Sequence, residues 1–278
     1  TIRLSDVVAV GEATIVYDRE GNEIDQYVST NSNRLSVGMD EIPDYMGKAF
    51  VAIEDERFYQ HNGIDFKSII RAGYQFFKTG GEEAQGASTI TQQLLKNTVF
   101  TDWTSEGNNK IKKIKRKIQE QYLALEITKY YSKDEILLRY MNAINLGQNT
   151  LGVESASLRY FGKHCSELTI SECAVIASIT QNPSKYNPIR HPEENVKRRK
   201  ECLTKMLELG FITQAQYDEA MADTDAVYER IGLYDIDYQE ANATTGSYFS
   251  DAVYEQVKQD LILAGYNETM AETLLTSG

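Results

Sequence analysis

Apolar residues recur at steps of three and four along much of this chain, and this spacing constrains the fold more than any other feature. Two series cover more than ten residues each: Phe66, Ile69, Ile70, Gly73, Phe76 and Phe77, then Ile111, Ile114, Ile118, Tyr122 and Leu125. A period near 3.6 residues puts such positions on one face of an α-helix. Only four prolines occur, and three of them lie at 183–192. From about residue 40 we therefore expect a mainly α fold.

The segments on either side of this helical stretch have different patterns. Residues 13–28 contain two β-prone runs around a polar turn, which is typical of a β-hairpin. Residues 193–222 predict two helices that meet near Gly210, a plausible residue to follow a helix end. From 223 the chain is acidic and tyrosine-rich, then amphipathic. We expect a strand-bearing lead-in at 1–39, a helical domain at 40–222 and a linker at 223–278.

Composition excludes several classes of protein. The net charge of -12 would repel phosphates over most of the surface, so we expect no nucleic-acid partner. The three cysteines, Cys165, Cys173 and Cys202, include no CxxC pair, which predicts buried thiols in place of zinc ligands or disulfides. No apolar run approaches the roughly 18 residues that a membrane-spanning helix needs.

Two adjacent acids, Glu54 and Asp55, precede His61 in the stretch AIEDERFYQHNGIDF. They could be metal ligands, a general acid/base pair or a charged helix end. The metal interpretation is weak because His61 has no second histidine at a ligand spacing. The residues alone leave the other two interpretations open.

A glycine-containing stretch at 79–97 predicts a loop that runs into a helix. Thr89 and Gln92 have the spacing of a capping box. Free N–H groups at such a helix end favour an anion, and Lys96 would add a charge. The same pattern is also typical of a plain loop and cap, and the spacing is not that of a phosphate-binding Walker loop.

A dense basic run lies at 108–126, with six cations among residues 110–117 of an acidic protein. Most such runs are solvated helix faces. Here, however, Arg116 and Lys117 precede Glu120 by four and three residues, so the three side chains share one face. A cation N-terminal to its acid is the weaker order for helix stability, whereas a diphosphate would be bound well by this pair.

Five stretches together resemble a known family. They resemble, in order, the five signature motifs of the peptidoglycan glycosyltransferases, glycosyltransferase family 51, which occur in class A penicillin-binding proteins and in monofunctional transglycosylases. The stretches are EDERFYQHNGID (54–65), QGASTITQQLLKN (85–97), RKIQEQYLALE (116–126), residues 133–163 and SECAVIASITQNPSKYNP (171–188).

The resemblance implies a fold and a place in the cell. It implies a lysozyme-like bilobal glycosyltransferase domain whose small lobe leans on the membrane, with a small β-hairpin lead-in. Its substrates would be lipid II and the growing lipid-linked glycan strand, and other cell-wall synthesis proteins are expected partners. It would work at the outer face of the bacterial cytoplasmic membrane, with an N-terminal anchor and a transpeptidase domain that are missing from this sequence.

The resemblance also assigns roles to residues that match the family's motifs. Glu54 corresponds to the general base, and Glu120 to the second essential carboxylate. Asp55 and His61 are expected to organise the turn around Glu54 by hydrogen bonds. The donor diphosphate and sugars would be bound by Ser88, Gln92, Gln93, Lys96, Arg116 and Lys117. Glu120 with substrate phosphates could hold a divalent cation, Mg²⁺ or Mn²⁺, and no organic cofactor is expected.

Two alternatives belong to other classes. A lysozyme-like glycan hydrolase would also use two carboxylates, but its neutral leaving group needs no cluster of cations. A non-catalytic scaffold for cell-wall assembly would tolerate the loss of Glu54, Lys96 and Glu120, and all three are present. The apolar series at 66–77 is interpreted either as a face toward lipid or as ordinary core. Residues 102–109 are expected to form a mobile polar loop.

Overall fold

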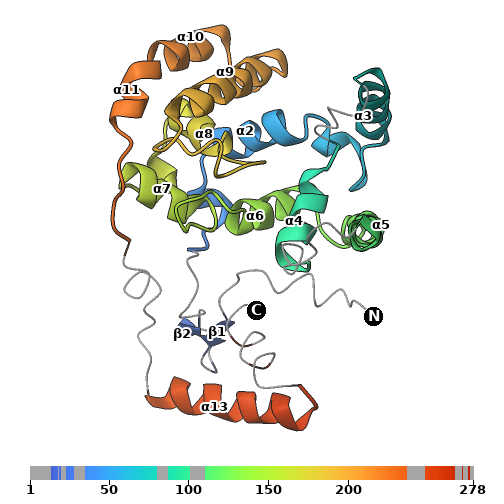
Figure 1. The fold of residues 1–278 in the computed structure, drawn as a ribbon. Coiled ribbons are helices and arrows are strands. Elements are labelled where there is room, and N and C mark those ends of the chain that lie inside the picture. Colours follow the sequence, from blue (N-terminus) through green and yellow to red (C-terminus); the bar gives the residue numbers. More distant parts are fainter. Residues whose placement is uncertain are drawn as a thin grey trace.

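The structure is a computed structural model that describes residues 35–79, 87–100, 110–236 and 248–266, together with short pieces of the termini at 14–17, 19, 23–27, 271 and 275. Figure 1 shows the arrangement, which is mainly α as predicted. The helices of the first half are η1 (Met39–Glu41), α2 (Asp44–Glu54), η2 (Phe58–Gln60), α3 (Phe66–Lys78), α4 (Ile90–Thr98), α5 (Lys110–Ile127) and α6 (Lys133–Ala143). Those of the second half are α7 (Val153–Phe161), η4 (Cys165–Glu167), α8 (Ile170–Ala177), α9 (Pro192–Glu208), α10 (Gln214–Ala222), α11 (Thr224–Glu229) and α13 (Tyr248–Leu263).

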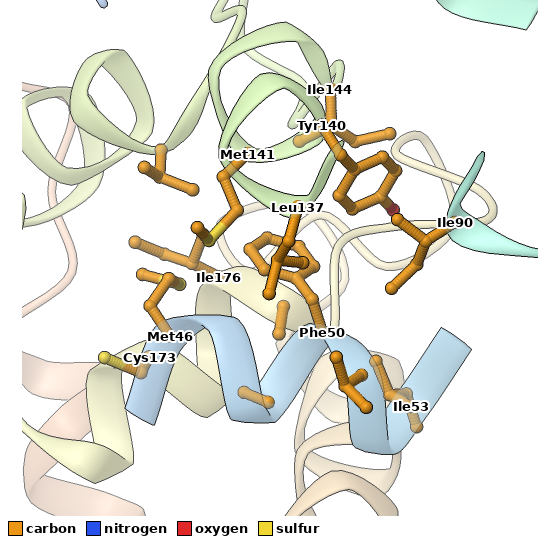
Figure 2. Packing of buried hydrophobic residues seen from close by; sticks show 14 of the residues in the cluster. Met46, Phe50, Ile53, Ile90, Leu137, Tyr140, Met141, Ile144, Cys173 and Ile176 are labelled. Atoms are coloured by element: carbon orange, nitrogen blue, oxygen red, sulfur yellow. The ribbon is translucent and has the colours of Figure 1, made fainter. Parts of the chain in front are cut away.

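Helix α2 lies at the centre of the helical body and packs against α8, α9 and α6 (Figure 1). Its apolar residues cover more than one face, and a helix that is apolar on most sides has to be buried. Met46 and Phe50 are fully buried. The Phe50 ring meets the Tyr140 ring of α6 edge to face at 5.5 Å between centroids, within the core that Figure 2 shows. Burial on this scale stabilises by about 1.5–3 kcal/mol for each large side chain.

Hydroxyl-bearing residues start four of the helices with a reciprocal cap. In each case a Ser or Thr side chain accepts from the amide three residues on, and that residue's Glu or Gln side chain accepts from the capping residue's own amide. The pairs are Thr89 with Gln92 (α4), Ser132 with Glu135 (α6), Thr169 with Glu172 (α8) and Thr213 with Gln216 (α10). The predicted capping box at Thr89 is therefore confirmed.

The predicted junction between α9 and α10 is also confirmed. Gly210 has φ +70, the left-handed conformation that a glycine adopts without strain after a helix end. All three cysteines are free and buried, as the composition predicts. Among the described residues, no helix combines the length and the apolar character needed to cross a bilayer.

The helical body extends past both boundaries that the sequence suggested. Leu35 is buried and its amide donates to the Ser155 hydroxyl at 3.0 Å, so the chain joins the body before residue 40. At the other end, Val227 of α11 is fully buried in the common core. The Tyr234 amide then donates to the Arg159 carbonyl at 3.0 Å. Packed structure therefore continues beyond residue 222, because α11 covers α8 and α10.

Two short strands, β1 (Thr14–Tyr17) and β2 (Glu23–Tyr27), pair antiparallel near the N-terminus. Their role as a lead-in to the helical domain stays a prediction. The expected mobile loop at 102–109 lies outside the described residues, so that expectation also stays a prediction.

The apolar series of α3 faces outward. Phe66, Ile70, Tyr74 and Phe77 are 66%, 72%, 69% and 85% exposed, whereas Ile69 packs partly against the core. The interpretation of this series as ordinary core is therefore wrong for these four residues. Helix α5 behaves similarly: its Ile114, Ile118 and Tyr122 are exposed, while it buries Glu120, Leu123, Ala124 and Ile127.

We predict that Gly63→Ala destabilises the protein strongly. Gly63 has φ +87, and an added Cβ would lie 2.1 Å from the backbone carbonyl oxygen of Ala124, which cannot move aside as a side-chain tip can. Strain and overlap together should lower the free energy of unfolding by roughly 2–4 kcal/mol, measured by chemical denaturation. Gly73→Ala is the matched control, because that site in α3 has open space. It should be neutral or slightly stabilising, and an equal loss in both variants would contradict the prediction.

Candidate active site

Glu54 ends α2 with its carboxylate held by donors from three other segments. The Gln93 side-chain amide of α4 donates to Oε2 at 2.9 Å. On Oε1, the Arg198 guanidinium of α9 donates at 2.8 Å, and the Thr180 hydroxyl donates as well. The Glu54 side chain is only 7% exposed, yet it lines an open cleft of about 650 Å³. A carboxylate fixed in this way, at the edge of a cleft, is suited to accept a proton from a bound ligand.

The residue after Glu54 joins two helices. Asp55 accepts from the amide of Ile90, the first residue of α4, at 3.0 Å. His61 Nε2 lies 2.9 and 3.0 Å from the two carboxylate oxygens of Asp55. Both residues therefore organise the turn around Glu54, as expected. Asp55 lines the cleft beside Glu54, whereas His61 is not among the residues that line it.

The expected anion site at the start of α4 has to be corrected in one respect. The Ile90 amide is occupied by Asp55, and the Gln92 amide donates to the Thr89 hydroxyl at 3.2 Å. These two N–H groups serve the fold and are not available to a ligand. An anion near α4 would have to be bound by other groups of the cleft.

The predicted basic residues converge on the same cleft. Lys96 comes from the last turn of α4, and Arg116 and Lys117 come from α5, which packs against α4. Burial and the two neighbouring cations lower the pKa of Lys96. Lys117 also donates to the Ser88 hydroxyl at 3.0 Å. Three cations that line one cleft favour a multiply charged anion between them.

Glu120 lies beneath these cations and does not line the cleft. Its side chain is 0% exposed, forms an ion pair with Arg116, and lies 2.8 Å from the Lys117 ammonium. It can therefore hold the two cations in position, but it cannot touch a substrate in this arrangement. A divalent cation at Glu120 would have to displace both partners, so Glu120 does not fit as a metal ligand. Among the described residues, no group of three or more His, Cys, Asp or Glu could hold a metal ion.

Most of the predicted site residues are brought together. Those that line the cleft are Glu54, Asp55, Ser88, Gln92, Gln93, Lys96, Arg116 and Lys117. Gln92 is largely used in capping α4, whereas Gln93 receives the Tyr140 hydroxyl on its oxygen and donates to Glu54. The two glutamines therefore differ in role, with Gln93 the one in contact with the candidate base.

Sequence reasoning missed residues that contact Glu54 or line the cleft beside it. Thr180 and Arg198 contact Glu54, and Tyr186 lies under the Arg198 guanidinium at 4.9 Å from the ring centroid. The neighbouring Gln181 has φ +66, a strained conformation of the kind that clusters at functional sites. Thr180 and Tyr186 lie inside the fifth motif-like stretch (171–188), so the resemblance to the family could have pointed to both of them. Arg198 lies in α9 among other basic residues, and no sequence pattern marks it as a site residue.

Comparison with known proteins gives the family. A family model described as transglycosylase matches residues 20–207. The chain belongs to the transglycosylase family. Similar proteins include penicillin-binding protein 1A of Clostridium perfringens strain 13 (39% identity, 98% of this chain, 40% of the relative) and of Clostridium botulinum strain Hall (39%, 100% and 33%). Another is penicillin-binding protein 1A of Aquifex aeolicus (41%, 76% and 27%).

These relatives are much longer than this chain, which spans 40% and 33% of the two clostridial proteins. A crystal structure of penicillin-binding protein 1A from Haemophilus influenzae matches with a TM-score of 0.43 at 21% identity, over 93% of this chain and 25% of that one. So low a score adds no argument about the site.

We predict that Arg116→Ala destabilises the protein by about 2–4 kcal/mol, because it leaves the buried Glu120 carboxylate with one cation fewer. The measurement is the free energy of unfolding from denaturant titration. Lys113→Ala is the control: Lys113 is exposed on the same helix, and its loss should cost less than about 0.5 kcal/mol. A small, equal effect of both changes would show that Glu120 does not depend on Arg116.

Proposed function

We propose that this chain polymerises lipid II into peptidoglycan glycan strands. Membership of the transglycosylase family supports the reaction class. The observation that carries the proposal is that one cleft is lined by a held carboxylate, Glu54, and by three cations, Lys96, Arg116 and Lys117. This pairing matches a reaction in which a hydroxyl loses a proton while a diphosphate departs.

In the proposed reaction, the 4-hydroxyl of the acceptor sugar attacks C1 of the donor sugar. Glu54 takes the hydroxyl proton as the new C1–O bond forms. The bond from C1 to the lipid diphosphate breaks at the same time, and the diphosphate leaves with the electron pair. A single displacement inverts the configuration at C1 and needs no covalent enzyme intermediate.

The cations have a separate part in this proposal. Lys96, Arg116 and Lys117 stabilise the charge that grows on the departing diphosphate, where fixed charges act without reorganisation. Glu120 acts through Arg116 and Lys117 by holding them, and Ser88 positions Lys117. Gln93 acts through Glu54. A requirement for Mg²⁺ or Mn²⁺ stays a prediction, and no step is assigned to the metal.

One observation bears against the hydrolase alternative. Glu120, the second carboxylate of the family's motifs, is fully buried and ion-paired, so it is not placed to act on a glycan. The cations would have no use with a neutral leaving group. The scaffold alternative gives no reason for the donors from three segments that converge on Glu54.

The outward apolar faces support a second part of the proposal, namely that the domain rests on the outer face of the bacterial cytoplasmic membrane. Exposed apolar side chains on α3 and α5 accompany exposed lysines on α5, a combination that favours an anionic lipid surface. If these two helices faced water, their exposed apolar side chains would gain nothing from that position.

We predict that Glu54→Gln abolishes polymerisation while it keeps substrate binding. Purified protein with lipid II and Mg²⁺ should form glycan polymer, visible on a gel, and Glu54→Gln should lower the rate by at least about a hundredfold. Glu208→Gln, an exposed acid at the end of α9, is the control and should retain full activity. Near-normal activity of Glu54→Gln would end its assignment as base. Cleavage of preformed strands without use of lipid II would favour the hydrolase.

We also predict that Phe66→Ser with Ile70→Ser weakens binding to vesicles of anionic phospholipid, because both side chains are exposed on α3. Cosedimentation should show at least a several-fold loss of bound protein. The control is Leu233→Ser, an exposed leucine elsewhere on the body, which should leave binding unchanged. Equal losses in the two proteins would argue against α3 as the membrane face.

A further inference from the structure

The reaction proposed above brings two diphosphates into one cleft, and the cations described so far serve only one of them. The donor loses its diphosphate beside Lys96, Arg116 and Lys117. The acceptor, lipid II, keeps its own diphosphate throughout the transfer, because only its 4-hydroxyl reacts. Two groups of this charge repel each other, so the diphosphate of the acceptor needs a cation apart from the first three.

Among the described residues, three further cations line the cleft: Arg71 of α3, and Arg198 and Lys205 of α9. Arg198 already serves Glu54, to which it donates at 2.8 Å. Lys205 lies 3.7 Å from the Glu201 carboxylate of its own helix. Arg71 and Lys205 are therefore the two candidates for a second anion.

The lipid tail of the acceptor distinguishes these two candidates. An acceptor that stays in the membrane holds its diphosphate at the level of the lipid head groups, beside the helix that rests on the bilayer. Helix α3 stands at the edge of the helical body (Figure 1) and exposes Ile70 immediately before Arg71 and Tyr74 one turn after it. Helix α9, all of which the structure describes, exposes no large apolar side chain. Arg71 is therefore the cation at the lipid side of the cleft.

Helix α3 has one stripe toward the cleft and another away from it. The residues that line the cleft are Ser68, Arg71 and Gln75, whereas the exposed apolar residues are Phe66, Ile70, Tyr74 and Phe77. Both sets follow steps of three and four, which keeps each on its own face of the helix. A diphosphate whose lipid tail lies along the apolar stripe would reach the polar stripe where Arg71 stands.

The guanidinium of Arg71 is available to a ligand. Its side chain is 54% exposed, and its bonds to Glu56 and to the Ser68 hydroxyl are long, at 3.2 and 3.3 Å. Exposed ion pairs of this kind contribute little to stability. Arg57 also donates to Glu56, at 3.0 Å, so Glu56 keeps a cation when Arg71 turns to a ligand. The planar guanidinium can then donate two parallel hydrogen bonds to a phosphate group.

Arg71 also lies within reach of the candidate base. Glu56 follows Glu54 by two residues, so their Cα atoms are at most about 7 Å apart. Arg71 meets the Glu56 carboxylate from α3. In lipid II, two sugar rings separate the 4-hydroxyl from the diphosphate. One acceptor molecule can therefore contact Glu54 at one end and Arg71 at the other.

We propose that Arg71 binds the diphosphate of the acceptor lipid II while Glu54 takes the proton of its 4-hydroxyl. This inference rests on the proposed function and adds a residue to it. Helices α4 and α5 carry the cations for the diphosphate that departs, and α3 carries the cation for the one that stays. Because the charge of the retained diphosphate does not change in the reaction, Arg71 contributes to binding of the acceptor and not to the chemical step.

The experiment measures the acceptor and the donor separately, in detergent micelles. A lipid II analogue that lacks the 4-hydroxyl can donate but cannot accept, so in excess it serves as the donor to ordinary lipid II. Arg71→Gln should raise the KM for lipid II by roughly tenfold or more, with kcat and the KM for the analogue unchanged. Arg71→Lys should show a smaller rise, because it keeps the charge and loses the planar fork. Lys67→Gln is the control and should behave as wild type, since Lys67 is an exposed cation of α3 that does not line the cleft.

Several results would overturn the inference. These are an unchanged KM for lipid II in Arg71→Gln, an equal rise in the KM for the donor analogue, and a fall in kcat alone. A defect that appears with vesicles of anionic phospholipid but not in detergent would show that Arg71 binds a phospholipid head group instead. If Arg71→Gln does not fold, as judged by circular dichroism, an unchanged KM for lipid II in Arg71→Lys overturns the inference. A wild type that makes no coupled product refutes the proposed function instead.

Binding to a variant without the base tests Arg71 without any turnover. Calorimetric titration of Glu54→Gln with lipid II in micelles should show two sites, one for the donor and one for the acceptor. The double variant Glu54→Gln with Arg71→Gln should lose one site and keep the other. Glu54→Gln with Lys67→Gln should keep both. Two sites of unchanged affinity in the variant that lacks Arg71 would overturn the inference, whether or not the wild type forms polymer.

Discussion

A single contact between the end of α2 and the start of α4 sets the geometry on which the cleft depends. The amide of Ile90 would be one of the unsatisfied donors at a helix N-terminus, and the Asp55 carboxylate accepts it across 35 positions of sequence. Because Glu54 precedes Asp55, this bond also determines where Glu54 lies relative to α4. Gln93, one turn further along α4, can then reach the Glu54 carboxylate. The capping of one helix and the placement of the base are thus one interaction.

The electrostatics of the cleft have the opposite sign to those of the chain. The whole sequence carries a net charge of -12, yet Lys96, Arg116 and Lys117 meet in one place. Such cations would repel one another, and the buried Glu120 keeps two of them together. A buried ion pair is often no more stabilising than apolar residues of the same size, so stability alone gives little reason for it. Its arrangement below the cleft that we propose binds a diphosphate does give one.

Local sequence patterns predicted the helices and part of the site. They could not predict contacts between residues that lie far apart in the sequence. The 3.6-residue period of the apolar residues predicted α3 and α5. The spacing of Thr89 and Gln92 predicted the cap of α4. Arg198 lies 144 positions from Glu54, and nothing local in α9 marks it. Periodicity also could not tell which way an apolar stripe faces, because burial depends on what packs against it; α3 therefore remained ambiguous until its neighbours were known. Glu120 was found as a carboxylate among cations, but its complete burial depends on α4 and α5 together.

The hydrogen bonds of Glu54 distinguish its two oxygens. A carboxylate has about four acceptor positions, two on each oxygen. Oε1 accepts from Thr180 and from Arg198, whereas Oε2 accepts from Gln93 only, among the residues that the structure describes. If Glu54 serves as base, Oε2 is the oxygen with room for the acceptor hydroxyl, and the donors on Oε1 hold the group still while the proton arrives. Gln93 then has a further role, because it limits the directions from which a hydroxyl can approach Oε2.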